Sequence, residues 1–126
     1  MMSDVLKPGN LWNPAIALRR MGADTSLLSC MVDYFLEDSP VLLRDLKQKI
    51  AAGDAPEASR LAHSLRSLCC NIEANDAAQA GTLVETACRA ETLDEASALM
   101  PPLTEQVRRL SDVLSIWKTS NPQEAE

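Results

Sequence analysis

Apolar residues in the last third of the chain recur alternately every three and four positions. They are Leu93, Ala96, Met100, Leu103, Val107, Leu110, Leu114 and Trp117. This spacing gives a helix one apolar stripe, and it is the longest periodic signal in the sequence. Pro101-Pro102 interrupts the pattern, so we expect a short turn of helix and then a long helix from about Pro101 to Lys118. Such a helix needs other helices against which to bury its stripe.

Three further stretches with helical spacing come before it. The first begins at Asp24 or Thr25, either of which can cap a helix, and ends at Gly53. Its apolar positions are Leu27, Leu28, Met31, Val32, Phe35, Leu36, Leu43, Leu46 and Ile50. Ser39-Pro40 lies in the middle and predicts either a kink or a fresh helix start.

The next two stretches are shorter. Residues 54–73 begin at the capping residue Asp54, with Pro56 in the first turn. Their apolar stripe consists of Ala58, Leu61, Leu65, Leu68 and Ile72. Asn75 and Asp76 are expected to form a corner before a helix over residues 77–90. The stripe of that helix is thin, with Ala77, Ala80, Val84, Ala87 and Cys88. Gly81 within it costs about 1 kcal/mol relative to alanine, which predicts a close helix crossing there.

A short helix from about Pro14 to Met21 precedes these segments. Together with Leu11 and Trp12 it offers too little apolar surface for the wall of a bundle, so it should cap one end. The pattern therefore predicts an all-α protein, an antiparallel four-helix bundle with a short extra N-terminal helix capping one end. We expect the bundle to cover residues 11–118, with a flexible N-terminus at 1–10 and a flexible tail at 119–126.

Composition limits the partners of this bundle. Of the 126 residues, 46% are hydrophobic and only 3% aromatic, which suits a single helical domain. The net charge of −6 disfavours nucleic acid and anionic membranes, so another protein is the expected partner. No apolar run approaches the roughly 20 residues of a membrane span, and the start lacks the apolar core of a signal peptide. We therefore expect a cytoplasmic monomer without membrane contact.

The four cysteines do not predict a metal site. Cys30, Cys69, Cys70 and Cys88 lack C-x-x-C spacing, and the single histidine cannot complete a zinc site. We expect reduced thiols and no metal or other cofactor in this chain, and a metal or redox protein is the weakest alternative. The chain also lacks a hydrolytic triad and the glycine-rich loop that holds ATP, so it is not an autonomous kinase.

The single histidine lies in the second of these stretches. His63 falls roughly opposite the apolar stripe, so its ring should face solvent. Its side of the helix also carries Ser59, Arg60, Arg66, Ser67 and Cys70. An exposed neutral imidazole is a competent nucleophile, and Arg66, three positions on, can offset the charge of a phosphoryl oxygen. On periodicity alone, such a pair is more often an ordinary solvated surface.

The run around this histidine resembles a known signature. Ala62–Ala74, A-H-S-L-R-S-L-C-C-N-I-E-A, resembles the A-H-x-L-K-G-s-a-x-x-x-G-A pattern of histidine-containing phosphotransfer (HPt) domains of two-component phosphorelays. The resemblance covers most of the chain. It extends to Phe35–Pro40 and Leu42–Gly53 upstream, and to Leu83–Glu85, Arg89 and Leu103–Trp117 downstream.

The resemblance implies a role for each matching residue. His63 would accept a phosphoryl group, and Arg66 would stand where the family usually has lysine. Glu85 would match a carboxylate or amide that orients the imidazole in some members, although a solvated Glu85 is equally compatible with its position at the flank of its helix. The docking face for partners would include Ser59, Arg60, Ser64, Ser67 and Cys70, with Leu28 and Met31 better explained as core. The partners would be a sensor or hybrid histidine kinase and receiver domains, and the Mg²⁺ would belong to the receiver.

Two departures from the signature leave an alternative open. Ser67 and Glu73 stand where the pattern has glycine, and the hydroxymethyl group of Ser67 narrows the approach to His63. The sequence therefore predicts a phosphorelay intermediate that accepts phosphoryl groups from one receiver and passes them to another. A degenerate member that only binds proteins, as a helical adaptor, is the alternative.

Overall fold

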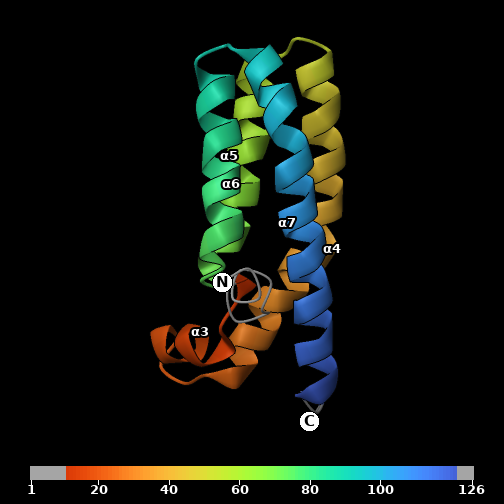
Figure 1. The fold of residues 1–126 in the computed structure, drawn as a ribbon. Coiled ribbons are helices and arrows are strands. Elements are labelled where there is room, and N and C mark those ends of the chain that lie inside the picture. The colour runs from red at the N-terminus through yellow and green to blue at the C-terminus, as the bar shows by residue number, and fades with distance from the viewer. Residues whose placement is uncertain (1–10, 122–126) are drawn as a thin grey trace, which may run out of the picture.

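The structure, a computed structural model, describes residues 11–121, and every regular element in that range is a helix. The helices are α3 (Pro14–Arg20), α4 (Thr25–Ala51), α5 (Ala55–Asn71), α6 (Asn75–Arg89) and α7 (Leu93–Ser120). The four long helices form an antiparallel bundle, and α3 lies across the lower ends of α5 and α6 (Figure 1). This confirms the predicted fold class. The expected flexible N-terminus at residues 1–10 lies outside the described residues, as do residues 122–126 of the tail expected at 119–126; the first two residues of that expected tail instead continue α7, which ends at Ser120.

The apolar stripes of the four long helices meet in one core. The largest fully buried side chains are Phe35, Leu28, Leu46, Leu65, Ile72, Leu103, Leu110 and Leu114. Within the bundle α4 packs on α5 and α7, and α6 packs on α5 and α7. Each helix thus buries its stripe against two neighbours, as spacing of three and four residues requires.

Both long helices continue through their prolines, so the interruption predicted at Pro101-Pro102 is wrong, and of the two alternatives at Pro40 the fresh helix start does not occur. α4 continues through Pro40, and α7 continues from Leu93 through Pro101 and Pro102 to Ser120. All three prolines are exposed, so the carbonyl groups that lose an N–H partner lie on the solvent side, where water can hydrate them. Apolar residues on both sides of each proline remain in the core and hold the helix together. The lower part of α4 leans toward α3, so Pro40 falls within a bent but continuous helix (Figure 1).

The corner between α5 and α6 lies two residues earlier in the chain than predicted. α5 ends at Asn71 rather than Glu73, and α6 begins at Asn75 rather than 77. Glu73 has φ of +62°, and the N–H of Ala74 donates to the carbonyl of Cys69 at 2.9 Å. This left-handed residue ends the helix in the way that glycine usually does. The sequence offers no glycine here, so the end could not be located from it.

The N-terminal residues are tied to this corner. The indole Nε1 of Trp12 donates to the carbonyl of Ile72 at 2.6 Å. The Trp12 ring also meets the Trp117 ring edge to face, with centroids 5.6 Å apart. Within α3, Ala17 is fully buried whereas Ile16 is 40% exposed. The helix caps the bundle end as predicted, but with its alanine side.

Candidate functional site

His63 lies on the outer face of α5, opposite the buried stripe. Its side chain is 52% exposed, so the ring projects into solvent as the helical spacing predicted. The neighbouring Ala62 and Leu65 are fully buried and fix the orientation of this helix face. An imidazole in this position is open to a second protein.

Glu85 of α6 lies beneath this imidazole. Only 4% of the residue is exposed, and its Oε2 atom is 3.0 Å from Nδ1 of His63. Arg66 donates from Nε to Oε1 at 2.8 Å, and Arg89 donates from a terminal nitrogen to Oε2 at 2.5 Å. The solvated position that the sequence left open for Glu85 is therefore not the one observed. Two helices supply a buried carboxylate with an imidazole and two guanidinium groups around it.

The electrostatics of this cluster favour an ionised carboxylate. Burial by itself raises the pKa of Glu85, but the hydrogen bonds from Arg66 and His63 outweigh it, so the pKa lies below the ordinary glutamate value. In turn, the hydrogen bond to Glu85 raises the pKa of Arg66. A negative charge thus stays under the exposed ring at neutral pH.

A glycine brings the two helices close enough for this contact. A Cβ atom at Gly81 would lie 3.4 Å from Cβ and 3.5 Å from Cα of Arg66. Gly81 is one helical turn before Glu85, and Arg66 is one turn after His63, so the crossing sits directly beside the cluster. The close crossing that the sequence predicted at Gly81 is confirmed.

A model of the Hpt domain family matches residues 31–113, which is more than half of the chain. The chain belongs to the Hpt domain family. No curated protein and no solved structure matches it. Membership makes it a histidine-containing phosphotransfer domain of two-component systems, a class whose partners are histidine kinases and receiver domains. The matched region contains His63, which is the only histidine of the chain.

The residues predicted for docking surround the histidine of this Hpt domain at different depths. Arg60 and Cys70 are exposed, whereas Ser59, Ser64 and Ser67 are half-buried. Arg60 pairs with Glu57 of the preceding turn rather than with the cluster. Arg60 is thus adjacent to His63 in the helix but takes no part in its hydrogen bonding.

A shallow groove runs from Ser64 toward α4. It has a volume of about 390 Å³ and is lined by Asp38, Val41, Leu42, Ser64 and Leu68. Val41 is 44% exposed, so the groove offers a partly apolar surface that reaches Ser64, the residue after His63 in the chain. The sequence did not identify this groove, because the α4 residues that line it cannot be placed beside α5 without the fold.

The core interpretation of Leu28 is correct, since it is fully buried; Met31 is partly buried and packs on the core.

Arg89 was not among the predicted site residues. Its position four residues after Glu85 on a helix was the available signal.

The two departures from the glycine pattern have different structural meanings. Glu73 adopts the left-handed conformation just after the end of α5, with φ of +62°. The second glycine of the signature therefore corresponds to a helix end. Ser67 instead lies half-buried on α5, four residues after His63. Of the two, only Ser67 lies within α5 on the same helix as the ring.

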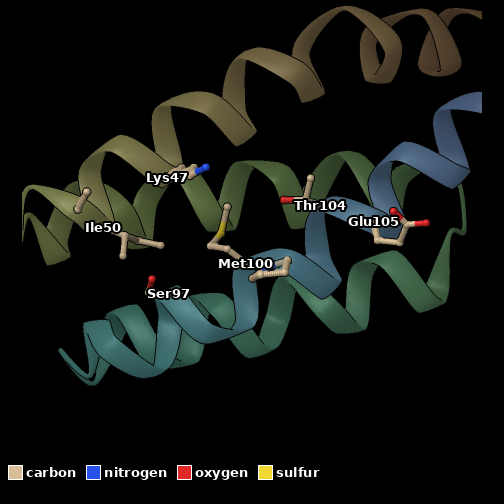
Figure 2. A pocket seen from close by; sticks show the side chains of 8 residues that line it. Lys47, Ile50, Ser97, Met100, Thr104 and Glu105 are labelled. Atoms are coloured by element: carbon tan, nitrogen blue, oxygen red, sulfur yellow. The ribbon is translucent and has the colours of Figure 1, made fainter.

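A larger hollow of the Hpt domain lies elsewhere, between α4 and α7. Its volume is about 570 Å³, and its lining includes Lys47 and Ile50 on one side and Ser97, Met100 and Thr104 on the other (Figure 2). Neither α5 nor α6 contributes to it. It is therefore separate from the histidine site.

Residues 11–121 contain neither a cluster of metal-ligating side chains nor a helix that could span a membrane. No group of three or more histidine, cysteine, aspartate or glutamate residues in that range could hold a metal ion. All four cysteines are free thiols. None of the helices over the same range is long and apolar enough to cross a membrane.

Proposed function

We propose that this Hpt domain accepts a phosphoryl group on Nε2 of His63 from the aspartyl phosphate of a receiver domain, and passes it to a second receiver. The observation that carries the proposal is the pairing of an exposed imidazole with a buried carboxylate at its Nδ1 atom. A carboxylate accepts a hydrogen bond from the Nδ1 proton, which leaves the lone pair on Nε2 and directs it outward.

The transfer then requires little more than positioning. The Nε2 lone pair attacks phosphorus, a bond between Nε2 and phosphorus forms, and the bond from phosphorus to the aspartate oxygen breaks. The aspartate leaves as a carboxylate, and the positive charge that develops on the ring is balanced by Glu85 through the Nδ1 proton. Arg66 offsets charge on the phosphoryl oxygens, and the receiver holds the Mg²⁺ with its own carboxylates. Transfer to the second receiver is the same step in reverse.

The docking face of the receiver surrounds the ring. We assign to it Ser59, Arg60, Ser64, Ser67 and Cys70, together with the groove that reaches Val41. Small and partly apolar residues allow close approach of another domain, and the exposed ring does not have to move for it. The chain would act as a monomer in the cytoplasm and would itself contribute no cofactor.

The test is transfer from a phosphorylated receiver domain. Receiver charged with acetyl phosphate should label the wild-type protein with acid-labile, alkali-stable phosphate, and His63→Gln should show no label. Arg108→Gln is the matched control, because Arg108 is an exposed arginine of α7 that pairs with Glu105 and Asp112 and is not part of the docking face, so it should retain label. Binding of receivers without any label on wild type would overturn the proposal in favour of the adaptor. Label persisting in His63→Gln would remove His63 from the reaction.

A further inference from the structure

One atom of the cluster has two partners with opposite requirements. Nδ1 of His63 lies 3.0 Å from Oε2 of Glu85 and 2.9 Å from a terminal nitrogen of Arg66. An ionised carboxylate can only accept a hydrogen bond, whereas a guanidinium group can only donate one. With a proton, Nδ1 donates to Glu85 and repels the N–H of Arg66. Without a proton, Nδ1 accepts from Arg66 and offers nothing to Glu85.

The two contacts therefore belong to different tautomers of the neutral ring. Donation to Glu85 requires the proton on Nδ1, which leaves the lone pair on the exposed Nε2 atom. Acceptance from Arg66 requires the proton on Nε2, which removes the lone pair that would attack phosphorus. The choice between Glu85 and Arg66 is thus a choice between a reactive and an unreactive imidazole.

We propose that Arg66 is a positioning residue that competes with Glu85 for Nδ1 of His63 and holds part of the free protein in the unreactive tautomer. This proposal rests on the proposed function, in that an arriving phosphoryl group would draw the terminal nitrogen of Arg66 to its oxygens. Nδ1 is then left to Glu85, and the ring becomes reactive when the phosphoryl group is in place.

The geometry of Arg66 suits such a movement. Its Nε atom donates to Oε1 of Glu85 at 2.8 Å, so the planar guanidinium group can tilt as a unit about that contact and displace its terminal nitrogens while the ion pair is kept. Lysine, which the family usually has here, carries its three donors on a single nitrogen, so it cannot hold Glu85 with one nitrogen while another moves to or from Nδ1. The competition is therefore a consequence of arginine at this position.

Arg89 keeps the competition balanced. It donates to Oε2 of Glu85 at 2.5 Å, the same oxygen that faces Nδ1. A cation on that oxygen weakens its attraction for the Nδ1 proton. The hydrogen bond from Nδ1 to Glu85 is therefore weak enough for Arg66 to compete with it. Every charged group that reaches the ring's Nδ1 or its carboxylate thus has a part in the equilibrium.

The single histidine makes this equilibrium directly measurable. Long-range nitrogen NMR of protein labelled with ¹⁵N-histidine reports the tautomer ratio from the two ring nitrogen shifts, at a pH where the ring is neutral. Wild type should show shifts between those of the two pure tautomers. Arg66→Met should raise the ratio in favour of the Nδ1–H tautomer by roughly three- to tenfold, the effect of removing one net hydrogen bond. Arg66→Lys should shift the ratio in the same direction.

Two controls keep the test decisive. Arg60→Met removes an arginine from the same helix that pairs with Glu57, and it should leave the ratio unchanged. Arg66→Lys preserves the charge next to Glu85, so it serves if Arg66→Met fails to fold. Unchanged ring shifts in a folded Arg66 variant would overturn the proposal, and so would a wild-type ring already held entirely in the Nδ1–H form.

The outcome is separable from that of phosphotransfer. A shifted ratio without any label on His63 would leave the competition standing and remove the proposed function. Label on His63 with an unchanged ratio would do the reverse.

Discussion

The pair α5 and α6 differs from the pair α4 and α7 in how closely its backbones approach. α5 and α6 have 17 and 15 residues, and they cross at Gly81 with main chain against main chain. α4 and α7 have 27 and 28 residues, contain three prolines, and enclose a hollow of about 570 Å³. The close approach of α5 and α6 thus lies beside the place where the side chain of Glu85 reaches across to the imidazole of His63.

The same difference separates the roles of polar groups. Between α5 and α6 the carboxylate of Glu85 is buried and has partners on both oxygens. Between α4 and α7 the polar contacts lie at the lower end, where Lys118 donates to Ser29 at 2.6 Å and pairs with Asp33 at 3.0 Å. The polar contacts between α4 and α7 therefore stabilise one end of the bundle, whereas those between α5 and α6 orient the imidazole ring of His63.

Enlarging Gly81 should have the largest effect on this contrast. Gly81→Leu places a side chain against the α5 backbone at Arg66, and overpacking of this kind costs about 1 to 3 kcal/mol. It should also move Glu85 away from His63 and slow labelling by a charged receiver. Urea unfolding and transfer rates measure the two effects. Gly81→Ala is the matched control, since a methyl group there is only in ordinary contact and should be tolerated.

Unchanged stability and transfer in Gly81→Leu would show that the close crossing is not needed.

Restoring a helix donor in α7 should act in the opposite direction and more weakly. Pro101→Ala supplies an N–H that can donate to the carbonyl of Ser97, and we expect a gain of about 1 to 2 kcal/mol. That figure is smaller than the roughly 3 kcal/mol cost of proline in a helix, because proline also restricts the unfolded chain. Transfer on His63 should be unaffected, since α7 does not touch the cluster. Denaturant midpoints measure the gain, and a loss of stability would mean that the hollow depends on the proline ring.

The acid response of Glu85 should be the smallest of these effects. Its pKa is lowered in the folded protein, so its contribution to stability is present above the ordinary glutamate pKa of about 4.3 and is lost as pH falls through the lowered value. Stability of wild type should therefore fall more steeply with acid than that of Glu85→Gln. Urea midpoints recorded between about pH 5 and pH 2 test this.

Other carboxylates do not obscure the comparison. Hydrogen bonds from Arg108 and Arg109 lower the pKa of Glu105 to about 2, but this group titrates alike in both proteins and cancels in the difference. Parallel acid curves for wild type and Glu85→Gln would contradict the assignment of Glu85 as a buried, paired carboxylate.

Much of the fold could be predicted from spacing alone. The apolar stripes, the capping residues and the short corners between them predicted the number of helices, their antiparallel arrangement and the fold class. The continuity of α4 and α7 could not be predicted, because proline disfavours a helix locally while burial on both sides of it is a property of the whole bundle. The end of α5 at Asn71 was not predicted for a related reason. Glu73 adopts a left-handed backbone conformation, which is unusual for glutamate and cannot be expected from the residue type.

The site was predicted in part. The helical spacing of the sequence predicted that His63 faces outward with Arg66 near it, and the resemblance to the HPt signature pointed to Glu85. What the sequence could not give was the depth of Glu85 or its contact with Arg89, because both depend on the distance between two helix axes. That distance is short at Gly81, where a Cβ atom would already be in van der Waals contact with Arg66.

The indole of Trp12 bears on where this folding unit ends. The family match begins at residue 31. The carbonyl of Ile72, at the end of the histidine-bearing helix, nevertheless accepts a hydrogen bond from Trp12, which lies before the matched region. A fragment trimmed to 31–113 would lose that donor and both members of the tryptophan pair. It would also lose the buried Ala17, which belongs to the core. Anyone excising the phosphotransfer unit for transplantation into another relay should therefore cut upstream of the indole and downstream of its aromatic partner.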